Sequence, residues 1–444
     1  MKIAVIGSGI AGMGAAWLLR QQHELTLFEK DARYGGHANT VTAHTPQGPV
    51  AVDTGFMVYN EPNYPNLCGL FRALGVQGRD TDMSFAVSAA GGDYEYAGDN
   101  LASLFAQRSN LFSARHYRML GQILRFNRLA ARALRSAGDE TVSLGEFLSQ
   151  HRFEGDFSER YLLPMTAAIW SCPGRTMRQF PALSLFRFLD NHGLISLNRR
   201  PQWKTPQGGS GQYVRRLTAQ LGDARCNASV VEVRRVSDGV SVRCSDGSEG
   251  HFDAVIMAAH ADQTLAMLAD PHPAERELLS AFTYQNNQAY LHADTRLMPL
   301  RRRAWSSWNY LTDNADDTAD AQAVSVTYWM NRLQHLPMAN PLLVSLNPLC
   351  PPASDSIYWQ AQYEHPVFDA AALQAQTRLA EIQGQDRIWY CGSYFRYGFH
   401  EDALASAVKV ARALGATIPW QEGGTAENNT RPDSAPQALT GAAL

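Results

Sequence analysis

Residues 2–12 of the chain, KIAVIGSGIAG, place an apolar run directly before the pattern G-x-G-x-x-G. The run predicts a buried strand, and residues 11–20 predict the helix that follows it. In such a turn the first glycine permits the tight bend, the second lets the backbone approach a diphosphate, and the third lets the helix pack on the strand. The start of the helix then offers unpaired N–H groups to the anion. This stretch therefore predicts the first β-α unit of a dinucleotide-binding domain.

Further strands and helices of the same domain are predicted both early and late in the chain. A second strand is predicted over 25–28 and ends at Glu29, about 20 residues after the glycines, where an acid accepts from ribose hydroxyls. Later strands are predicted over 230–233, 240–244, 254–258 and 388–391, followed by a helix near 402–414. Long blocks, 60–205 and 265–385, lie between these units. The order predicts a discontinuous nucleotide-binding domain and a second domain built from the insertions.

Composition excludes several classes of protein. The 444 residues include 39 Lys and Arg and 42 Asp and Glu, a net charge of −3, which excludes a globally basic nucleic-acid binder and an acidic disordered chain. No apolar run reaches the ~18–20 residues of a membrane span, and the first residues lack a signal-peptide pattern. Six scattered cysteines without C-x-x-C predict neither a disulfide framework nor a zinc site, and so a reducing cytoplasm is expected. Residues 421–444, which are poor in apolar side chains, are predicted to be disordered.

Further motifs identify the nucleotide. They are Arg-Tyr-Gly-Gly-His at 33–37, Val-Asp-Thr-Gly-Phe at 52–56, Pro-Gln-Gly-Gly-Ser at 206–210, Cys-Gly-Ser at 391–393 and Gly-Phe-His-Glu-Asp-Ala-Leu at 398–404. With them, residues 1–415 resemble the flavin-containing amine oxidase and phytoene desaturase superfamily, and are most similar to its bacterial, amine-oxidase-like NAD/FAD-binding branch. The resemblance implies an α/β fold. A Rossmann-type FAD-binding domain of the GR2, or amine-oxidase-like, type is expected at 1–80, 200–265 and 385–415, and a discontinuous α+β substrate domain at 81–199 and 266–384.

The resemblance also implies non-covalent FAD as the cofactor. The opening turn would hold the pyrophosphate, Glu29 the ribose and Val230 the adenine, while the turn at 398–401 would point N–H groups at the flavin ring. Many relatives have Arg in place of His37, and Asp or Glu in place of Ser393. The implied cofactor-binding residues are Gly7, Ser8, Gly9, Ile10, Ala11, Gly12, Glu29, Lys30, Gly35, Gly36, His37, Gly55, Phe56, Met57, Val58, Val230, Gly392, Ser393, Gly398, Phe399, His400, Glu401 and Ala403.

Several sequence features indicate the class of substrate. Without a second G-x-G-x-x-G, hydride is expected to come from an organic substrate rather than NAD(P)H, with O2 or another acceptor taking the electrons; redox-neutral isomerisation is an alternative. Relatives that oxidise amines place a Lys near flavin N5, and Gln288 falls there in this chain. As a group, the large aromatic residues in the inserted blocks suggest an apolar pocket, although any single one is more simply explained as ordinary core. The predicted pocket residues are Trp170, Gln288, Trp305, Trp308, Trp329 and Tyr394.

The predicted function is thus an FAD-dependent oxidoreductase that takes hydride from a hydrophobic substrate to flavin N5, a dehydrogenase or desaturase acting on lipid acyl chains. One alternative is a flavin amine oxidase. The other is a non-catalytic lipid carrier similar to the GDP-dissociation inhibitors. No catalytic residue and no metal ligand is predicted, because hydride transfer to a flavin needs no obligatory protein base when the substrate is well oriented.

One further segment is rich in arginine. Seven arginines and no acid lie between residues 101 and 138, and a helical projection puts Arg118, Arg125, Arg128, Arg132 and Arg135 on one side. The projection puts Leu120, Ile123, Leu124, Ala131 and Leu134 on the other side. The segment could dock on an anionic membrane surface, which would place the protein at the inner face of the membrane. It could also be a solvated face whose arginines pair with acids elsewhere. No nucleic-acid partner is expected.

Overall fold

The opening β-α unit forms where its pattern predicts. β1 (Lys2–Ile6) is buried except at its first residue, and α1 (Ile10–Leu19) is buried along its whole length because it carries only apolar residues and glycine. β2 (Glu24–Phe28) runs parallel to β1. The computed structural model describes residues 1–136, 142–153, 155–170, 174–195, 201–312 and 325–421. The predicted tail, 421–444, lies outside the described residues beyond Gln421.

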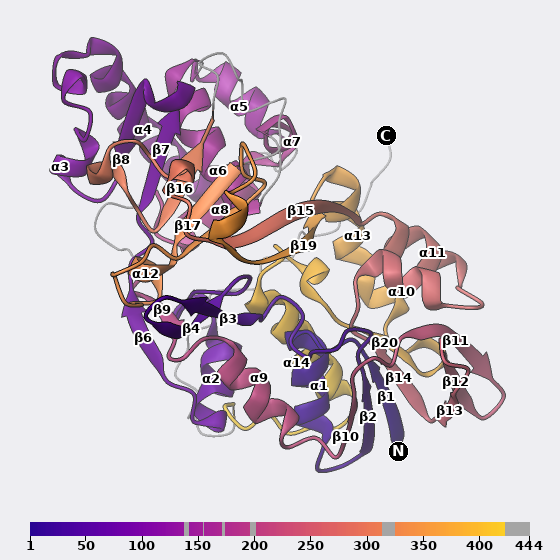
Figure 1. Ribbon diagram of the computed structural model, residues 1–444. Helices are drawn as coiled ribbons and strands as arrows, with labels where there is room; N and C mark the ends of the chain where they lie inside the picture. Colours follow the sequence, from indigo (N-terminus) through magenta and orange to yellow (C-terminus); the bar gives the residue numbers. More distant parts are fainter. Residues whose placement is uncertain (137–141, 154, 171–173, 196–200, 313–324, 422–444) are drawn as a thin grey trace, which may run out of the picture.

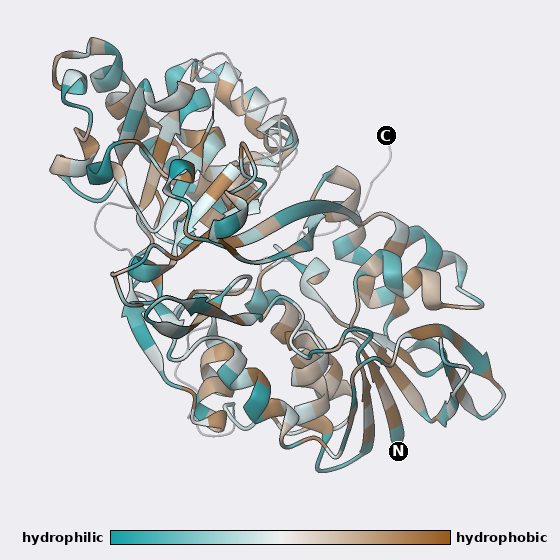
Figure 2. Cartoon of the chain, viewed as in Figure 1, coloured by the Kyte–Doolittle hydropathy of each residue, from teal (hydrophilic) through white to brown (hydrophobic). Residues whose placement is uncertain are grey.

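A five-stranded parallel sheet grows from this unit in the order β10-β2-β1-β14-β20 (Figure 1). Its other strands are β10 (Asp223–Arg225), β14 (Ala254–Met257) and β20 (Ile388–Tyr390). A parallel sheet must be covered on both faces, and its strands are accordingly hydrophobic (brown in Figure 2). One face packs on α1, α2 (Pro65–Leu74), α9 (Gly211–Thr218) and α14 (His400–Ala413). Segments from both ends of the chain thus build this one domain.

The opposite face carries elements that the predicted domain boundaries assign elsewhere. α11 (Pro273–Ser280) and α13 (Ala370–Arg378) fall within the 266–384 block, yet Leu278, Leu279 and Ala372 pack with Ile6 and Met257 of the parallel sheet. The reason is that these helices supply the apolar cover that the second face needs. α10 (Ala261–Met267) and the antiparallel sheet of β11 (Val230–Val236), β12 (Gly239–Cys244) and β13 (Glu249–Phe252) complete this layer.

The inserted blocks build a second, seven-stranded sheet in the order β19-β15-β18-β17-β16-β7-β8. Its strands are β7 (Phe85–Ala89), β8 (Tyr94–Ala97), β15 (Thr283–His292), β16 (Trp308–Leu311), β17 (Ser325–Trp329), β18 (Leu343–Leu346) and β19 (Ile357–Val367). All pairs are antiparallel except β16 with β7. The long β15–β19 ribbon reaches from this sheet toward the nucleotide-binding domain (Figure 1).

Helices cover the second sheet around a cluster of phenylalanines that includes Phe126, Phe157 and Phe186. They are α4 (Ala114–Arg135), α5 (Leu144–Gln150), α6 (Leu163–Trp170), α7 (Gly174–Gln179) and α8 (Ala182–Asn191). Shorter elements join the two domains: α12 (Met330–Leu333), β3 (Thr40–Thr45), β4 (Gly48–Asp53), β5 (Tyr59–Asn60), β6 (Gly78–Thr81) and β9 (Trp203–Pro206). The short helix α3 (Leu101–Leu104) lies beside β8 at the outer end of the second domain (Figure 1). No helix in the described ranges is long and apolar enough to cross a bilayer.

The arginine-rich segment is not one helix. It divides into α3, the 3-10 turn η2 (Arg108–Phe112) and α4, which begins after Ser113 because that hydroxyl accepts the N–H of His116. The buried stripe of α4 is centred on Met119, Phe126 and Ala130. Leu124, which the projection places opposite the arginines, lies well away from this stripe and is 42% exposed.

Candidate active site

A cavity of about 990 Å3 lies where the two domains meet. It is bounded by the carboxyl ends of the parallel strands, the first residues of α1 and α14, the β15–β19 ribbon and aromatic side chains of the second domain. This is the edge of an open parallel sheet at which ligands bind. The volume is at the upper end of ordinary small-molecule pockets, as a dinucleotide with a substrate would need.

Most of the predicted residues meet in this cavity, although they come from widely separated parts of the chain. Those that line it are Gly7, Ser8, Gly9, Ile10, Ala11, Glu29, Lys30, Gly35, Gly36, His37, Gly55, Phe56, Met57, Val58, Trp170, Val230, Trp308, Gly392, Ser393, Tyr394, Gly398, Phe399, His400 and Ala403. Gly12, Gln288, Trp305, Trp329 and Glu401 are not among the lining residues.

The glycine turn has the geometry of a diphosphate cradle. Gly7 has a φ of +102°, and its N–H donates to the carbonyl of Phe28 at 2.8 Å, which closes the turn after β1. A Cβ on Gly12 would collide with the carbonyl oxygen of Gly7, so this residue serves close packing rather than contact with a ligand. A Cβ on Gly9 would meet nothing within 4 Å. The backbone of Gly9 therefore faces open space at the N-terminus of α1, where an anion is stabilised.

Glu29 stands at the end of β2, as its spacing predicts, and is 7% exposed. Its carboxylate accepts from the Ser8 N–H at 3.0 Å, from the Ser8 hydroxyl at 2.5 Å and from the Asp31 N–H at 2.9 Å. These bonds fix the acid beside the glycine turn. An acceptor held in this way can receive a ribose hydroxyl.

Three histidines lie close together beside the glycine turn. Two of them, His260 and His365, come from distant parts of the sequence. The ring of His37 lies 5.4 Å from that of His365 and 6.4 Å from that of His260. Burial lowers the pKa of all three from 6.5, with that of His365 falling to about 4. They are therefore neutral at pH 7, and each can donate one N–H bond without bringing a permanent charge.

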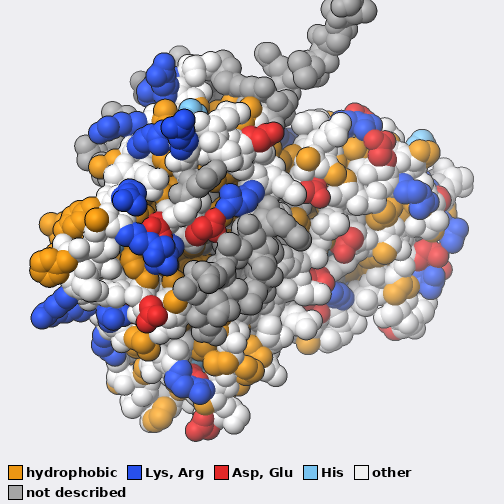
Figure 3. Space-filling model, turned by 90° about the horizontal axis from the view of Figure 1, so that it is seen from above, with side chains coloured by type: hydrophobic (Ala, Val, Ile, Leu, Met, Phe, Trp, Pro, Cys, Tyr) orange, Lys and Arg blue, Asp and Glu red, His pale blue; other side chains and the backbone are white. Residues whose placement is uncertain are grey.

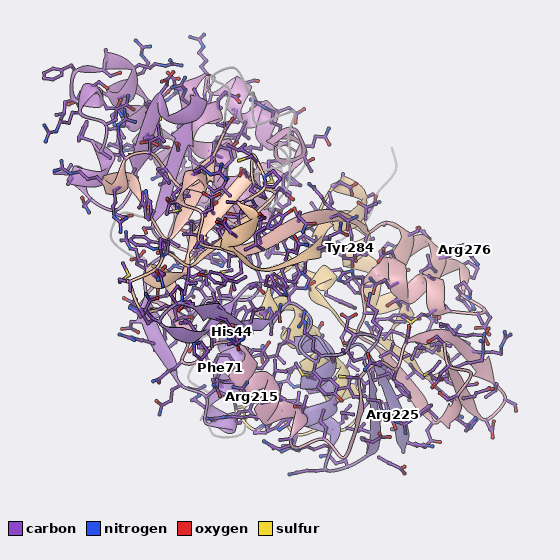
Figure 4. The ribbon with its side chains drawn as sticks, in the orientation of Figure 1. His44, Phe71, Arg215, Arg225, Arg276 and Tyr284 are labelled. Atoms are coloured by element: carbon purple, nitrogen blue, oxygen red, sulfur yellow. The ribbon has the colours of Figure 1, made fainter. Side chains whose placement is uncertain are left out.

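Neighbouring side chains hold these histidines in place. Glu364 lies 3.3 Å from His260 Nδ1, and Asn287 lies within hydrogen-bond distance of His365 Nδ1. The ring of Tyr284, labelled in Figure 4, stacks on His260 at 4.3 Å from its place on β15. The orientation of the histidines is thus fixed by the ribbon that joins the two domains.

The start of α14 forms the opposite end of the cavity. His400, the first residue of this helix, stacks on Phe56 with ring centroids 3.8 Å apart, and its Nε2 lies 2.9 Å from the Tyr213 hydroxyl. Burial lowers the pKa of His400 to about 3, so the ring is neutral. The motif thus directs the N–H groups of a helix start at the cavity, which favours negative charge there.

Glu401 does not line the cavity. Its carboxylate points away from the cavity and accepts from the N–H groups of Asn66 and Leu67 at 3.0 Å, which satisfies the first turn of α2. Burial raises the pKa of Glu401 to about 7. Glu401 therefore joins α14 to α2.

The substrate-side predictions are only partly correct. Trp170, Trp308 and Tyr394 line the cavity. Trp305 and Trp329 instead pack edge-to-face against each other at 5.3 Å, in a separate cluster on the second domain. They are ordinary core residues, because each finds its apolar partner locally.

Gln288 does not line the cavity, contrary to its predicted place near the flavin. Its backbone N–H donates to Asn347 at 2.8 Å, and in the antiparallel register it pairs with Gln362 of β19. Gln362, not Gln288, lines the cavity. At this point of the ribbon, β19 rather than β15 faces the cavity.

Sequence reasoning missed much of β19 and the end of β14. The residues not predicted include Tyr363, Glu364 and His365 on β19, and Ala258, Ala259 and His260 after β14. A signal for the second group was present, since ligand-binding loops follow the carboxyl ends of parallel strands. Nothing in the composition of β19 separates it from an ordinary strand.

A sequence profile of the family described as flavin containing amine oxidoreductase matches residues 10–340. The chain belongs to this family. It is a flavin-dependent oxidoreductase, and the expected Rossmann-type α/β fold is confirmed. No curated protein sequence matches the chain.

Solved structures share this amine oxidoreductase fold at low identity. A CLA-producing fatty acid isomerase from P. acnes is 16% identical, with a TM-score of 0.64 over 92% of this chain and 98% of that one. A putrescine oxidase bound to putrescine is 15% identical, with a TM-score of 0.62 over 93% and 99%. Cyclohexylamine oxidase from Brevibacterium oxydans IH-35A is 13% identical, with a TM-score of 0.62 over 93% and 99%.

The residues of the cavity fit a flavin nucleotide. Gly9 leaves space for a diphosphate, and two buried donors on lining residues, Arg33 Nη1 and His37 Nε2, have no partner within the described part of the chain. Buried donors are normally satisfied, and a diphosphate supplies acceptors for both. The described ranges contain no cluster of His, Cys, Asp and Glu that could hold a metal ion.

This fit gives a prediction for His37. We expect His37→Leu to weaken flavin retention by roughly tenfold, because a hydrogen bond to a charged group contributes about 1.5–3 kcal/mol. The measurement is flavin release from the purified protein during dialysis. His44→Leu is the control, since His44, on β3 and labelled in Figure 4, is exposed and does not line the cavity. Equal retention in both variants would remove His37 from the binding site.

Proposed function

We propose that this amine oxidoreductase binds FAD non-covalently and takes hydride from a hydrophobic organic substrate such as a lipid acyl chain. The observation that carries the proposal is the apolar wall of the cavity, which lies outside the nucleotide motifs except for Phe399. That wall is made by Met83, Ile169, Trp170, Trp308, Tyr328, Leu346, Trp359, Phe368, Tyr397 and Phe399. Such a surface favours an apolar ligand and gives little to a small polar one.

Charge in the cavity supports the same substrate class. The acids among the described lining residues are Glu29, Asp31 and Glu364. Glu29 is occupied by the glycine turn, and Glu364 faces His260 at 3.3 Å. The aromatic wall itself thus offers no carboxylate to a cationic amine. Burial of the ammonium charge against this wall would cost considerable free energy.

Non-covalent attachment is supported by the cysteines. No cysteine is among the described lining residues. Cys391 lies next to the Gly392 motif, but it is fully buried, and burial raises its pKa to about 12. A thiol that stays protonated is a poor nucleophile.

The chain's own residues bind and orient rather than react. When bound, FAD supplies a hydride acceptor at N5 of its ring. The glycine turn, Arg33 and His37 would hold the diphosphate, and the start of α14 would favour negative charge near Phe56. The aromatic wall would orient the substrate and exclude water, and orientation of this kind accounts for much of the rate in such reactions. We expect O2 or another acceptor to remove the electrons, in keeping with a cytoplasmic setting.

A reduction assay tests this proposal. We expect the purified protein to be yellow, with a band near about 450 nm, and we expect unsaturated fatty acids or isoprenoid lipids to bleach it anaerobically. Putrescine and cyclohexylamine are the amine arm of the panel. Bleaching by amines alone would overturn the proposed substrate class. A lipid product that forms without bleaching and without O2 uptake would replace dehydrogenation by isomerisation.

Met83 offers a matched pair of variants for the same assay. Met83 lines the cavity and is half-buried in the loop between β6 and β7, so it tolerates a polar side chain better than the core does. We expect Met83→Glu to lower the rate of bleaching by lipid at least about tenfold, because a carboxylate in an apolar site is costly. Met83→Gln, of equal size, should lower it less. A rate of amine oxidation that rises in Met83→Glu would favour an amine substrate instead.

A further inference from the structure

The arginines of α4 form an exposed face, in which, over the described part of the chain, only the Arg125 guanidinium stacks on a core ring, that of Phe153 at 4.7 Å. Arg118, Arg125, Arg128, Arg132 and Arg135 are all exposed and project on the same side of the helix. Within the described residues, Arg118, Arg128 and Arg132 have no acidic partner. By contrast, Asp156 pairs with Arg115 and Arg160. Among the described residues, these three arginines are therefore not paired with acids.

Large apolar side chains stand beside these arginines and are exposed as well. Phe112 is 92% exposed and Leu101 is 76% exposed, and Tyr117 and Leu124 of α4 are 49% and 42% exposed. The Tyr117 hydroxyl donates to the Leu111 carbonyl at 3.2 Å, which holds η2 against α4. We call these residues, with the five arginines, the α4 face. Several large apolar side chains exposed together on one part of the surface indicate an interaction surface.

A distant segment adds to the same face. Leu300 is 74% exposed, and its N–H donates to the buried carboxylate of Glu95 on β8 at 2.6 Å. The side-chain amide of Asn110, in η2, donates to the Glu95 carbonyl at 3.3 Å. Glu95 thus brings Leu300 and the exposed Arg302 and Arg303 to the side of η2. Figure 3 shows Lys and Arg (blue) and hydrophobic side chains (orange) gathered at the end of the molecule where α3 and α4 lie.

We propose that the α4 face docks on the surface of an anionic lipid bilayer. Charge complementarity selects the partner: arginines without acids bind the phosphates and anionic headgroups of the surface. The apolar side chains select a bilayer over a nucleic acid, because Phe112, Leu101 and Leu300 have no role on a phosphate backbone but insert among acyl chains at the interface. Docking would keep the protein next to lipids, the substrate class of the proposed function, but the contact itself does not depend on that function.

Vesicle co-sedimentation of the flavin-loaded protein tests the proposal. We expect binding at low salt to vesicles of phosphatidylcholine with one quarter phosphatidylglycerol, little binding to pure phosphatidylcholine, and release at high salt. The variant Arg118→Glu/Arg128→Glu should reduce binding about tenfold or more, since each basic residue near an anionic surface adds to the affinity. Phe112→Ser, which removes an apolar side chain without a change in charge, should reduce binding even to vesicles rich in anionic lipid.

The control variant is Arg215→Glu/Arg276→Glu, which makes the same change in net charge. Both arginines are exposed and lie on α9 and α11, far from α4 (labelled in Figure 4). We expect this variant to bind vesicles as the parent protein does. An absence of binding to anionic vesicles, or an equal loss in the two double variants, would overturn the proposal. So would displacement of the protein from vesicles by double-stranded RNA with no effect of Phe112→Ser.

Two readouts separate this result from the proposed function. The flavin band and the thermal unfolding midpoint of Arg118→Glu/Arg128→Glu should match those of the parent protein, because neither residue lines the cavity. Bleaching by detergent-dispersed lipid should also be unchanged. Loss of vesicle binding with unchanged bleaching supports docking by the α4 face. Loss of both in step would assign these arginines to the fold rather than to a docking surface.

Discussion

Replacement of Gly9 by valine is expected to leave the protein folded but colourless. Gly9 has a φ of −63° and a ψ of 176°, which valine readily adopts, and a Cβ there would touch no atom of the protein within 4 Å. The added methyl groups would occupy the space that a diphosphate needs at the start of α1. We expect flavin affinity to fall by at least about 100-fold, the equivalent of about 2.7 kcal/mol. The ratio of absorbance at about 450 nm to protein absorbance measures this loss.

Two other glycines control this experiment. Gly222→Val adds the same side chain at an exposed glycine with open space around it, outside the cavity, and should retain the flavin. Gly12→Val should instead fail to fold, because its Cβ meets the Gly7 carbonyl inside the turn. A Gly9→Val protein that is as yellow as the parent protein would show that the diphosphate lies elsewhere.

Removal of the Glu275 carboxylate is expected to lower the stability of the folded protein. Glu275 is fully buried on α11, where it accepts from Arg235 Nη2 at 2.5 Å, the Tyr390 hydroxyl at 2.5 Å and the His272 N–H at 2.7 Å. These bonds join α11 to β11 and β20. Glu275→Ala leaves the half-buried Arg235 without its closest acid, a change that costs about 3 kcal/mol. We expect the midpoint of thermal unfolding to fall by roughly 5 °C or more.

Glu277, two residues along the same helix, provides the matched control. Its carboxylate is 60% exposed and pairs with Arg378 on the surface. Exposed pairs contribute at most about 1 kcal/mol, so Glu277→Ala should shift the midpoint only slightly. Equal shifts in the two variants would mean that the buried carboxylate does not join these elements.

The sequence alone determined the elements of the nucleotide-binding domain. β1, α1, β2, β14, β20 and α14 lie within two residues of their predicted bounds. Such elements are set by local periodicity and by glycines whose backbone geometry other residues cannot adopt. The cavity-lining residues near Gly9 and Phe56 were predictable for the same reason, since each stands in a short motif with its own turn.

Tertiary structure alone decided the remainder. Trp170 and Trp305 are indistinguishable in the sequence, yet one lines the cavity and the other packs on Trp329. His260 and His365 meet His37 only because β14 ends beside the glycine turn and β19 passes over it. The place of each of these side chains depends on a partner far along the chain. Local patterns fix how a segment folds, but burial and contact are fixed by which segments pack together.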